Sequence, residues 1–306
     1  MKVYDCVPFF NEVDLLRLRL SELDPVVDKF IVVQATTTFQ GDDKPVIPLQ
    51  DDARLAPFAH KLCHVVVADL PRTTTPWFAE NLQRNQVKEA LAEAQPDDLV
   101  LLSDVDEIPN RRAVRDAQVV PRGQVAAFDM SFFYYGFNWA LPTRWNRARA
   151  FRAAALTYLT PTELRACPPD ITVAAAGWHL SYFYPRHELV QKIQTKAVAF
   201  SHGEYSTADY LQPRYLEFCL RGGLSWCTVP RYVLKLQFRE LEATYPEDVT
   251  ERPASWAGYC VPPRERDGVA EAKALFLSIA ARTWLRAPLS VRQLAQYRSD
   301  RPSWRG

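Results

Sequence analysis

The stretch LVLLSDVDEIP, residues 99–109, decides the fold of this chain. Its first four residues, 99–102, are apolar, and three acids follow closely: Asp104, Asp106 and Glu107. A short unbroken apolar run predicts a strand that is buried on both faces, as in a parallel sheet covered by helices. The acids then lie at the carboxyl end of the strand, where open α/β sheets bind their ligands.

Asp104 and Asp106 are two positions apart, so their carboxylates point the same way on an extended backbone. Two carboxylates this close repel each other unless a cation lies between them. Oxygen ligands suit Mg²⁺ or Mn²⁺, which hold the phosphates of a nucleotide with only one or two protein carboxylates. Asp-x-Asp is also a common string, and solvated acids or a helix cap would explain it without a metal. The buried strand favours the metal.

The composition is that of a soluble globular protein. The chain has 306 residues, of which 48% are apolar and 24% charged, and its formal net charge is +1. This length suffices for one large domain or two small ones. The near-neutral charge argues against nucleic acid as a partner. Six cysteines without a C-x-x-C spacing do not predict a disulfide framework.

The first residues, 1–6, contain no charged segment followed by a long apolar one, so a secretory signal is not expected. The longest apolar runs are too short to span a membrane. We therefore expect a cytoplasmic protein without a transmembrane segment. Peripheral contact with a membrane surface stays open, and the pattern does not indicate an oligomeric state.

The first third of the chain alternates between strands and helices, which is typical of a mostly parallel sheet. The pattern predicts strands at 2–10, 29–35, 62–68 and 99–102, and helices at 13–23, 53–61 and 76–94. Asn11 is placed to cap the first of these helices. Only Gly41 occurs before residue 123, so neither a dinucleotide-binding glycine motif nor a P-loop is expected.

The rest of the chain predicts a second set of elements, rich in aromatic residues. Strands are expected at 125–139, 149–156 and 174–184, and helices at 187–200, 209–221 and 270–285, with a shorter helix from Thr160. Gly222 and Gly223 end the helix before them. No repeat or flexible linker divides the chain, so the elements predict one α/β domain, a mixed sheet with helices on both faces.

Four separated strings resemble glycosyltransferase family 17. They are VYDCVPFFNEVDLLRLRLSEL at 3–23, DKFIVVQATTTFQG at 28–41, LVLLSDVDEIP at 99–109 and GWHLSYF at 177–183. The resemblance covers residues 1–225, in the expected order, and is more specific than the Asp-x-Asp string alone. Beyond Trp226 little of the chain resembles the family.

The resemblance implies a GT-A type, Rossmann-like catalytic domain over residues 1–225. Within it, 1–109 would be the nucleotide-binding half and 124–225 the acceptor-side half, and 226–306 a helical extension packed on the same domain. The family's named activity is that of a β-1,4-mannosyl-glycoprotein β-1,4-N-acetylglucosaminyltransferase. It implies a UDP-N-acetylglucosamine donor, a carbohydrate acceptor, dependence on Mn²⁺ or Mg²⁺, and inversion at the sugar carbon. The membrane anchor of animal members has no counterpart here, so a Golgi glycoprotein acceptor is not expected.

Three residues are the candidate metal ligands: Asp104, Asp106 and His179. We expect Asp106 to bind the metal directly and Asp104 to reach the ribose or a metal-bound water, although the two roles could be exchanged. His179 alternates with Trp178 on a strand, so the two face opposite ways and one of them faces the site. A core imidazole bonded to backbone is the alternative for His179, and His202 is the competing ligand.

The catalytic base is expected among carboxylates near the acceptor. Glu163 begins the helix after a predicted acceptor-side strand, and Glu107 belongs to the acidic string; Asp170 and Glu204 are weaker candidates. Glu163 also completes a capping box with Thr160, which would give it a purely structural role.

The donor-binding candidates lie at the ends of the predicted strands and on one helix. They are Asn11, Glu12, Gln34, Arg84, Asp104 and Trp178. Gln34 stands where the family leads us to expect an acid, and Arg84 could instead pair with Glu80 one turn earlier. Half of the aromatic residues in 132–139 are expected in the acceptor cleft and the other half in the core.

Two rival functions use the same acids. In a phosphohydrolase, Asp104 would be the nucleophile and Asp106 the acid, but the second acidic metal motif that such enzymes need is missing. In a sugar-binding module without catalysis, the acids would hold Ca²⁺ and the aromatic residues would stack on sugars, but this does not explain the parallel-sheet half.

Overall fold

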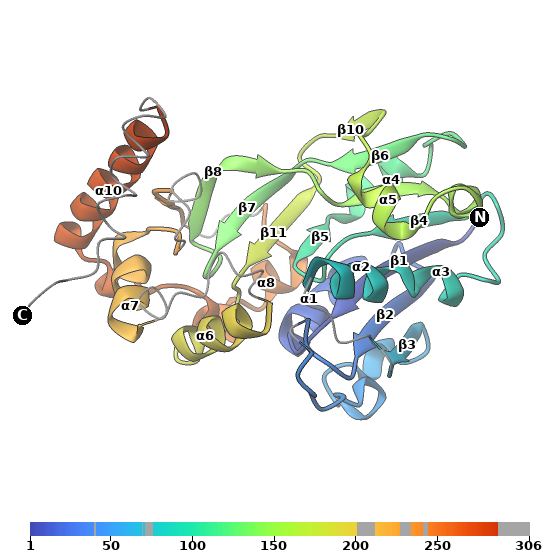
Figure 1. Cartoon of the computed structure of the whole chain (residues 1–306), viewed down its shortest axis with the longest axis horizontal. Coiled ribbons are helices and arrows are strands. Elements are labelled where there is room, and N and C mark those ends of the chain that lie inside the picture. Colours follow the sequence, from blue (N-terminus) through green and yellow to red (C-terminus); the bar gives the residue numbers. More distant parts are fainter. Residues whose placement is uncertain are drawn as a thin grey trace, which may run out of the picture.

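The fold is described from a computed structural model of the chain (Figure 1). It covers residues 1–39, 41–68, 70, 76–200, 212–226, 234–240 and 244–286, and the structural statements below concern these residues. The candidate residues His202 and Glu204 lie outside them. The predicted α/β class and single domain are confirmed, but the strands form two mixed sheets instead of one.

The larger sheet has seven strands, in the order β10-β6-β9-β4-β1-β2-β3. They are β1 (Val3–Phe9), β2 (Lys29–Ala35), β3 (Leu62–Val67), β4 (Leu99–Leu102), β6 (Val125–Phe128), β9 (Arg149–Arg152) and β10 (Ile171–Val173). Strands β1 to β4 are mutually parallel, as predicted, and β9 runs antiparallel to both its neighbours. The carboxyl ends of β1, β2 and β4 therefore meet at one edge.

Helices cover both faces of this sheet. One face packs against α1 (Val13–Leu23) and α4 (Arg111–Ala117), and the other against α3 (Val87–Ala90) and α5 (Pro161–Ala166), with α2 (Pro76–Asn85) beside them. Alternating side chains of β4 separate the two cores: Leu99 and Leu101 face α1, whereas Val100 and Leu102 face α3. The expected helix at 76–94 is divided at Gln86 into α2 and α3.

The smaller sheet has five strands, in the order β12-β8-β7-β11-β5. They are β5 (Glu107–Pro109), β7 (Met130–Tyr134), β8 (Trp139–Trp145), β11 (Gly177–Ser181) and β12 (Gln237–Phe238). The expected strand at 125–139 is divided among β6 in the larger sheet, β7 in the smaller sheet and the first residue of β8. The acidic stretch leaves the larger sheet after Leu102 and enters the smaller one at Glu107, so that Asp104 and Asp106 lie in the connection between the sheets.

The remaining helices pack around the smaller sheet and the first helix. They are α6 (Leu189–Phe200), α7 (Pro213–Gly222), α8 (Glu247–Glu251), α9 (Pro253–Trp256) and α10 (Gly268–Arg286), with short 3₁₀ turns at Leu49–Asp51, Ala56–Phe58, Ala153–Thr157, Ala257–Tyr259 and Pro263–Glu265. Trp256 and Tyr259 join the core under α1, and α10 packs on α7 (Figure 1). Within the described ranges, none of the helices combines the length and apolar character needed to cross a bilayer.

The predicted helix signals have mixed outcomes. The capping box of Thr160 and Glu163 is confirmed, and Gly223 ends α7 in the left-handed region, at φ 61°. The prediction that Asn11 caps α1 is wrong: Glu12 is the N-cap residue, and its side chain makes no capping hydrogen bond. That carboxylate is instead used across the chain, as described below.

A buried arginine joins the first helix to the acidic connection. Arg19, on α1, is fully buried and donates two hydrogen bonds to the Asp5 carboxylate of β1, at 2.7 and 2.6 Å. It also donates to the Ser103 hydroxyl at 2.7 Å and to the carbonyls of Asp104 and Glu107 at 3.1 and 2.7 Å. All five N–H donors of the guanidinium are thereby used. Arg19 thereby fixes the backbone that carries the acids.

We expect Arg19→Met to lower the free energy of unfolding by about 3–5 kcal/mol, because it leaves the buried Asp5 carboxylate without its partner. Denaturant unfolding followed by circular dichroism measures this. Arg115→Met, which changes an exposed arginine of α4, is the control and should stay within about 0.5 kcal/mol of the wild type. Equal losses for the two variants would contradict the role given to Arg19.

Candidate functional site

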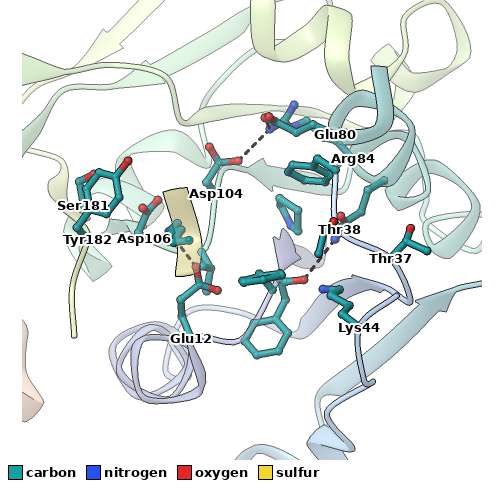
Figure 2. A pocket seen from close by; sticks show the side chains of 17 residues that line it. Glu12, Thr37, Thr38, Lys44, Glu80, Arg84, Asp104, Asp106, Ser181 and Tyr182 are labelled. Carbon is teal, nitrogen blue, oxygen red and sulfur yellow. Dashed lines mark hydrogen bonds and ion pairs between the residues drawn. The ribbon is translucent and has the colours of Figure 1, made fainter. Parts of the chain in front are cut away.

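A cavity of about 210 Å³ opens at the carboxyl ends of β1, β2 and β4 (Figure 2). The segments after β1 and β2, helix α2, the acidic connection, the end of β11 and helix α6 line it with residues 8–10, Glu12, 37–39, Lys44, Glu80, Gln83, Arg84, 104–106, Ser181, Tyr182 and Lys196. Four of the predicted site residues thus converge here: Glu12, Arg84, Asp104 and Asp106. The cavity lies where the sequence places the ligand of an open α/β sheet.

Asp104 is held between two arginines. Arg84 Nη2 donates to its Oδ1 at 3.1 Å and Arg165 Nη2 donates to its Oδ2 at 2.6 Å. Burial opposes ionisation of Asp104, but the two guanidinium groups outweigh this effect and lower its pKa. Arg84 also binds Glu80 at 2.7 Å, so the pairing considered for it is present, and its donor-binding role stays a prediction. With each carboxylate oxygen bound to an arginine, Asp104 is already neutralised by the protein.

Glu107 does not line the cavity. Its carboxylate is fully buried and accepts from Trp145 Nε1 at 2.6 Å, from the backbone N–H of Asp104 at 3.0 Å, and from both terminal nitrogens of Arg165 at 2.7 and 2.8 Å. These contacts fix Arg165, and through it the Asp104 carboxylate. The geometry gives Glu107 a positioning role and leaves no approach for a substrate.

Asp106 lies on the other side of the cavity, toward Ser181 and Tyr182 (Figure 2). Its carboxylate faces His179, with Oδ2 3.7 Å from Nε2. At this distance His179 forms no hydrogen bond with it, and among the described residues no other side chain does. Burial opposes its ionisation, but His179 and Lys196 outweigh burial and lower the pKa of Asp106. Asp106 is therefore an ionised carboxylate available to a ligand.

His179 is held between two aromatic rings. Its imidazole lies 4.4 Å from the Phe132 ring and 4.2 Å from the Trp145 ring, centroid to centroid. Nε2 points toward Asp106, and the buried Nδ1 has no hydrogen-bond partner among the residues that the structure describes. Trp178 faces the opposite side of the sheet, where its indole N–H donates to the carbonyl of Thr244 at 3.0 Å. The predicted alternation is confirmed, and it is His179 that faces the acids.

Glu12 and Lys196 form an ion pair between the two halves of the chain. Lys196 Nζ lies 2.9 Å from Glu12 Oε1, and the backbone N–H of Asn11 donates to Glu12 Oε2 at 3.0 Å. Burial of Glu12 opposes its ionisation, but Lys196 outweighs this and lowers its pKa. Asn11 itself lines a neighbouring cavity with Glu12, and its buried side-chain oxygen has no partner within the described ranges.

Lys44 adds a cation on the β2 side of the cavity. Its ammonium lies 4.5 Å from the centre of the Phe10 ring. Burial lowers the pKa of Lys44 to about 8, with only Glu12 opposing the shift. Three cationic side chains from separate parts of the chain therefore line this cavity: Lys44, Arg84 and Lys196.

Two further predicted residues, Glu163 and Gln34, also lie apart from the cavity lining. The exposed Glu163 carboxylate accepts from the backbone N–H and the hydroxyl of Thr160, both at 2.8 Å, so it is occupied in its cap. Gln34 is fully buried; its amide, oriented by its neighbours, pairs with both backbone groups of Ile47 and donates to His64. Neither side chain reaches the acids.

A sequence profile of Glycosyltransferase family 17 matches residues 1–223. The chain belongs to this family. It is similar to the β-1,4-mannosyl-glycoprotein 4-β-N-acetylglucosaminyltransferases of Rattus norvegicus, Homo sapiens and Mus musculus, each 28% identical over 150 residues. These matches cover 46% of the chain but only 28% of each relative, so the chain spans less than a third of the curated relatives' length.

Membership of family 17 supports a glycosyltransferase over the two rival functions. The arrangement of Asp104 agrees with this, because a carboxylate bound to two arginines is not available as the nucleophile of a phosphohydrolase. Within the described part of the chain, no three His, Cys, Asp or Glu side chains converge as a Ca²⁺ cage would require.

The residues around Asp106 fit a divalent ion that is shared with a substrate. Asp106 and His179 offer one carboxylate oxygen and one imidazole nitrogen, neither of which has a further partner among the described residues. Mg²⁺ and Mn²⁺ can be bound with only two protein ligands when phosphate oxygens and water complete the coordination shell.

Sequence reasoning missed four residues that line or support this cavity: Lys44, Trp145, Arg165 and Lys196. Arg165 lies two positions after Glu163 on a capped helix, where it looks like any solvated arginine. Lys196 is 184 residues from its partner Glu12. A lysine or arginine becomes recognisable as part of a site only when the fold places it beside an acid, so no local signal could have found them.

Neutralising the two predicted catalytic acids should destabilise the protein to different extents. We expect Glu107→Gln to lower the free energy of unfolding by about 3 kcal/mol, because the amide puts a donor where Arg165 and Trp145 donate. Glu163→Gln should cost at most about 1 kcal/mol, the value of one cap. Denaturant unfolding measures both, and a Glu163→Gln loss as large as that of Glu107→Gln would contradict these placements.

Proposed function

We propose that the protein is a metal-dependent, inverting glycosyltransferase that moves N-acetylglucosamine from UDP-N-acetylglucosamine to a carbohydrate acceptor. One observation carries the proposal: an available carboxylate, Asp106, and three cations, Lys44, Arg84 and Lys196, line one cavity at the ends of parallel strands. Such a cavity suits a diphosphate and a divalent ion. The choice of N-acetylglucosamine as the transferred sugar rests on the names of the relatives.

We propose a GT-A type fold for residues 1–225. In support, the parallel strands β1, β2 and β4 end at the cavity, and the acids lie where the chain passes from one sheet to the other. Residues 1–109 would bind the nucleotide, because they supply the cavity wall between Phe10 and Lys44. Residues 124–225 would supply the acceptor side, with Tyr182 and Lys196.

In this proposal Asp106 and His179 would hold Mn²⁺ or Mg²⁺. The ion, when bound, neutralises charge on the departing diphosphate. Arg84 and Lys44 would bind phosphate oxygens directly. Asp104 keeps Arg84 at the cavity wall, and its one-third exposed carboxylate can still reach a ribose hydroxyl.

We propose Glu12 as the base, in place of Glu163 and Glu107. It lines the cavity between the acceptor side and the nucleotide side, it is ionised, and each of its bonded oxygens retains a lone pair. The acceptor hydroxyl oxygen attacks the anomeric carbon while the bond from that carbon to the phosphate oxygen breaks. UDP leaves with the bonding electrons, and the hydroxyl proton passes to Glu12. One such displacement inverts the anomeric centre. A β-mannoside, named by the relatives, is the first acceptor to examine.

Thermal unfolding tests the donor site. At saturating UDP with Mn²⁺, about 100 times Kd, we expect Tm to rise by roughly 4 °C above the value with Mn²⁺ alone. Asp106→Asn should abolish the metal-dependent part of this rise while the unliganded protein stays folded.

Asp116→Asn, an exposed carboxylate of α4, is the matched control and should keep the full rise in Tm. UDP release from UDP-N-acetylglucosamine should show the same order among the variants. If UDP with Mn²⁺ gives no rise beyond Mn²⁺ alone in the wild type, the proposed donor site is wrong.

Lys44 predicts a pH dependence of UDP binding. Its ammonium attracts phosphate only below its pKa of about 8, so affinity should fall as pH rises. In Mg²⁺, we expect Kd for UDP to be about tenfold higher at pH 9 than at pH 7, and nearly constant for Lys44→Met. Isothermal titration calorimetry measures both. A wild-type Kd that does not change over this range would exclude Lys44 from phosphate binding.

A further inference from the structure

The smaller sheet turns a row of half-buried aromatic rings toward the acids. On β7, Phe132 and Tyr134 point to the same side as His179 and are partly exposed, whereas Phe133 between them is buried in the main core. Tyr182 follows β11 directly and lines the cavity itself (Figure 2). Alternation along the strands thus divides the aromatic cluster into a core half and a site half.

The row is continuous and starts at the carboxylate of Asp106. His179, which faces Asp106, stacks on Phe132. From Phe132 the ring of Tyr134 is 6.2 Å away, and from Tyr134 the ring of Tyr182 is 5.2 Å away, centroid to centroid. These spacings are those of rings in direct contact. The row therefore connects Asp106 with Tyr182, the ring that lines the cavity.

Tyr182 is held in an unusual backbone conformation. Its φ is 50°, in the left-handed region that residues with a bulky side chain rarely adopt. Such strain persists where the surroundings fix it, and it gathers at binding sites. Trp226 packs edge-on against Tyr182, at 5.3 Å, and its buried indole N–H has no acceptor among the described residues. A buried donor without a partner requires an explanation, such as a ligand or water oxygen.

We propose that Tyr182, with Tyr134 and Phe132 beside it, forms the acceptor subsite, on which a pyranose ring stacks through its C–H face. This inference rests on the proposed function and names the part of the cavity that binds the acceptor. The flat ring takes the apolar face of the sugar, and the polar groups around it take the hydroxyls. Lys196, 5.8 Å from the Tyr182 ring centre, and Glu12, its partner, lie on that rim.

The placement also orients the reaction. Tyr182 and Asp106 line the same cavity, and Glu12 lies between the acceptor side and the nucleotide side. A sugar stacked on Tyr182 presents a hydroxyl at its edge toward Glu12, and the anomeric carbon of the donor lies beyond. The aromatic row thus selects rings with an unobstructed C–H face, and Lys196 and Glu12 select the hydroxyl that reacts.

Saturation-transfer NMR with methyl β-D-mannopyranoside, in the presence of UDP and Mg²⁺, tests the subsite. Irradiation of protein aromatic protons should transfer saturation mainly to H1, H3 and H5, which lie on one face of the ring. Tyr182→Leu keeps an apolar side chain but removes the flat ring, so we expect about tenfold weaker binding of the sugar. Tyr182→Phe should restore it.

Tyr158→Leu makes the same substitution at a tyrosine that is 87% exposed and does not line the cavity, and it should leave the signal unchanged. Calorimetry of UDP binding on the same samples separates the two proposals. If UDP binds normally but the mannoside gives no signal, or gives the same signal with Tyr182→Leu, the subsite is overturned. If UDP does not bind to the wild type, it is the proposed function that fails.

Discussion

The buried guanidinium of Arg19 is the interaction on which the site depends. It is satisfied by Asp5 on one side and by the Ser103 hydroxyl and two carbonyls of the acidic connection on the other, with all five donors used. A charge this deep is tolerated only when every partner is in place, since an unpaired buried charge costs several kcal/mol. The connection between the two sheets is therefore fixed by the same network that anchors α1 to β1. Asp104 and Asp106 stand on that fixed backbone.

The negative charges of Asp104 and Asp106 are compensated in different ways. Asp104 is neutralised by Arg84 and Arg165, and Arg165 is in turn oriented by the buried Glu107. Asp106 has no arginine on it in the described part of the chain and faces the imidazole of His179. One carboxylate thus belongs to the frame of the cavity, and the other is left for a ligand. Two acids of a short motif that look equivalent in the sequence have separate tasks in the fold.

The strands, helices and the edge that carries the site could be predicted from periodicity and from caps. Strand β2 has the predicted bounds, and the alternation of Trp178 and His179 correctly left one of them facing the acids. Periodicity could not show that the chain changes sheets between Leu102 and Glu107, because a run of extended residues looks alike in one sheet or two. An acid within an apolar strand, Asp5, was nevertheless a visible signal of a buried partner.

The side chains that complete the site come from distant parts of the chain, which is why Lys44, Arg165 and Lys196 escaped prediction. Glu163 shows the opposite error. Its position matched a catalytic role, yet its carboxylate closes a capping box that holds α5 and so presents Arg165, two residues later, to Asp104. The acid acts on the site through helix geometry and has no contact with the cavity.

The way Arg19 grips the acidic connection has an evolutionary consequence. Apart from the Ser103 hydroxyl, it holds carbonyl oxygens, which every amino acid possesses, and not the carboxylates of residues 104 and 106. Its hold on the loop therefore does not depend on which side chains stand at these two positions. Substitutions at residues 104 and 106 can therefore change the chemistry at this edge of the sheet while Arg19 keeps its contacts with the loop backbone.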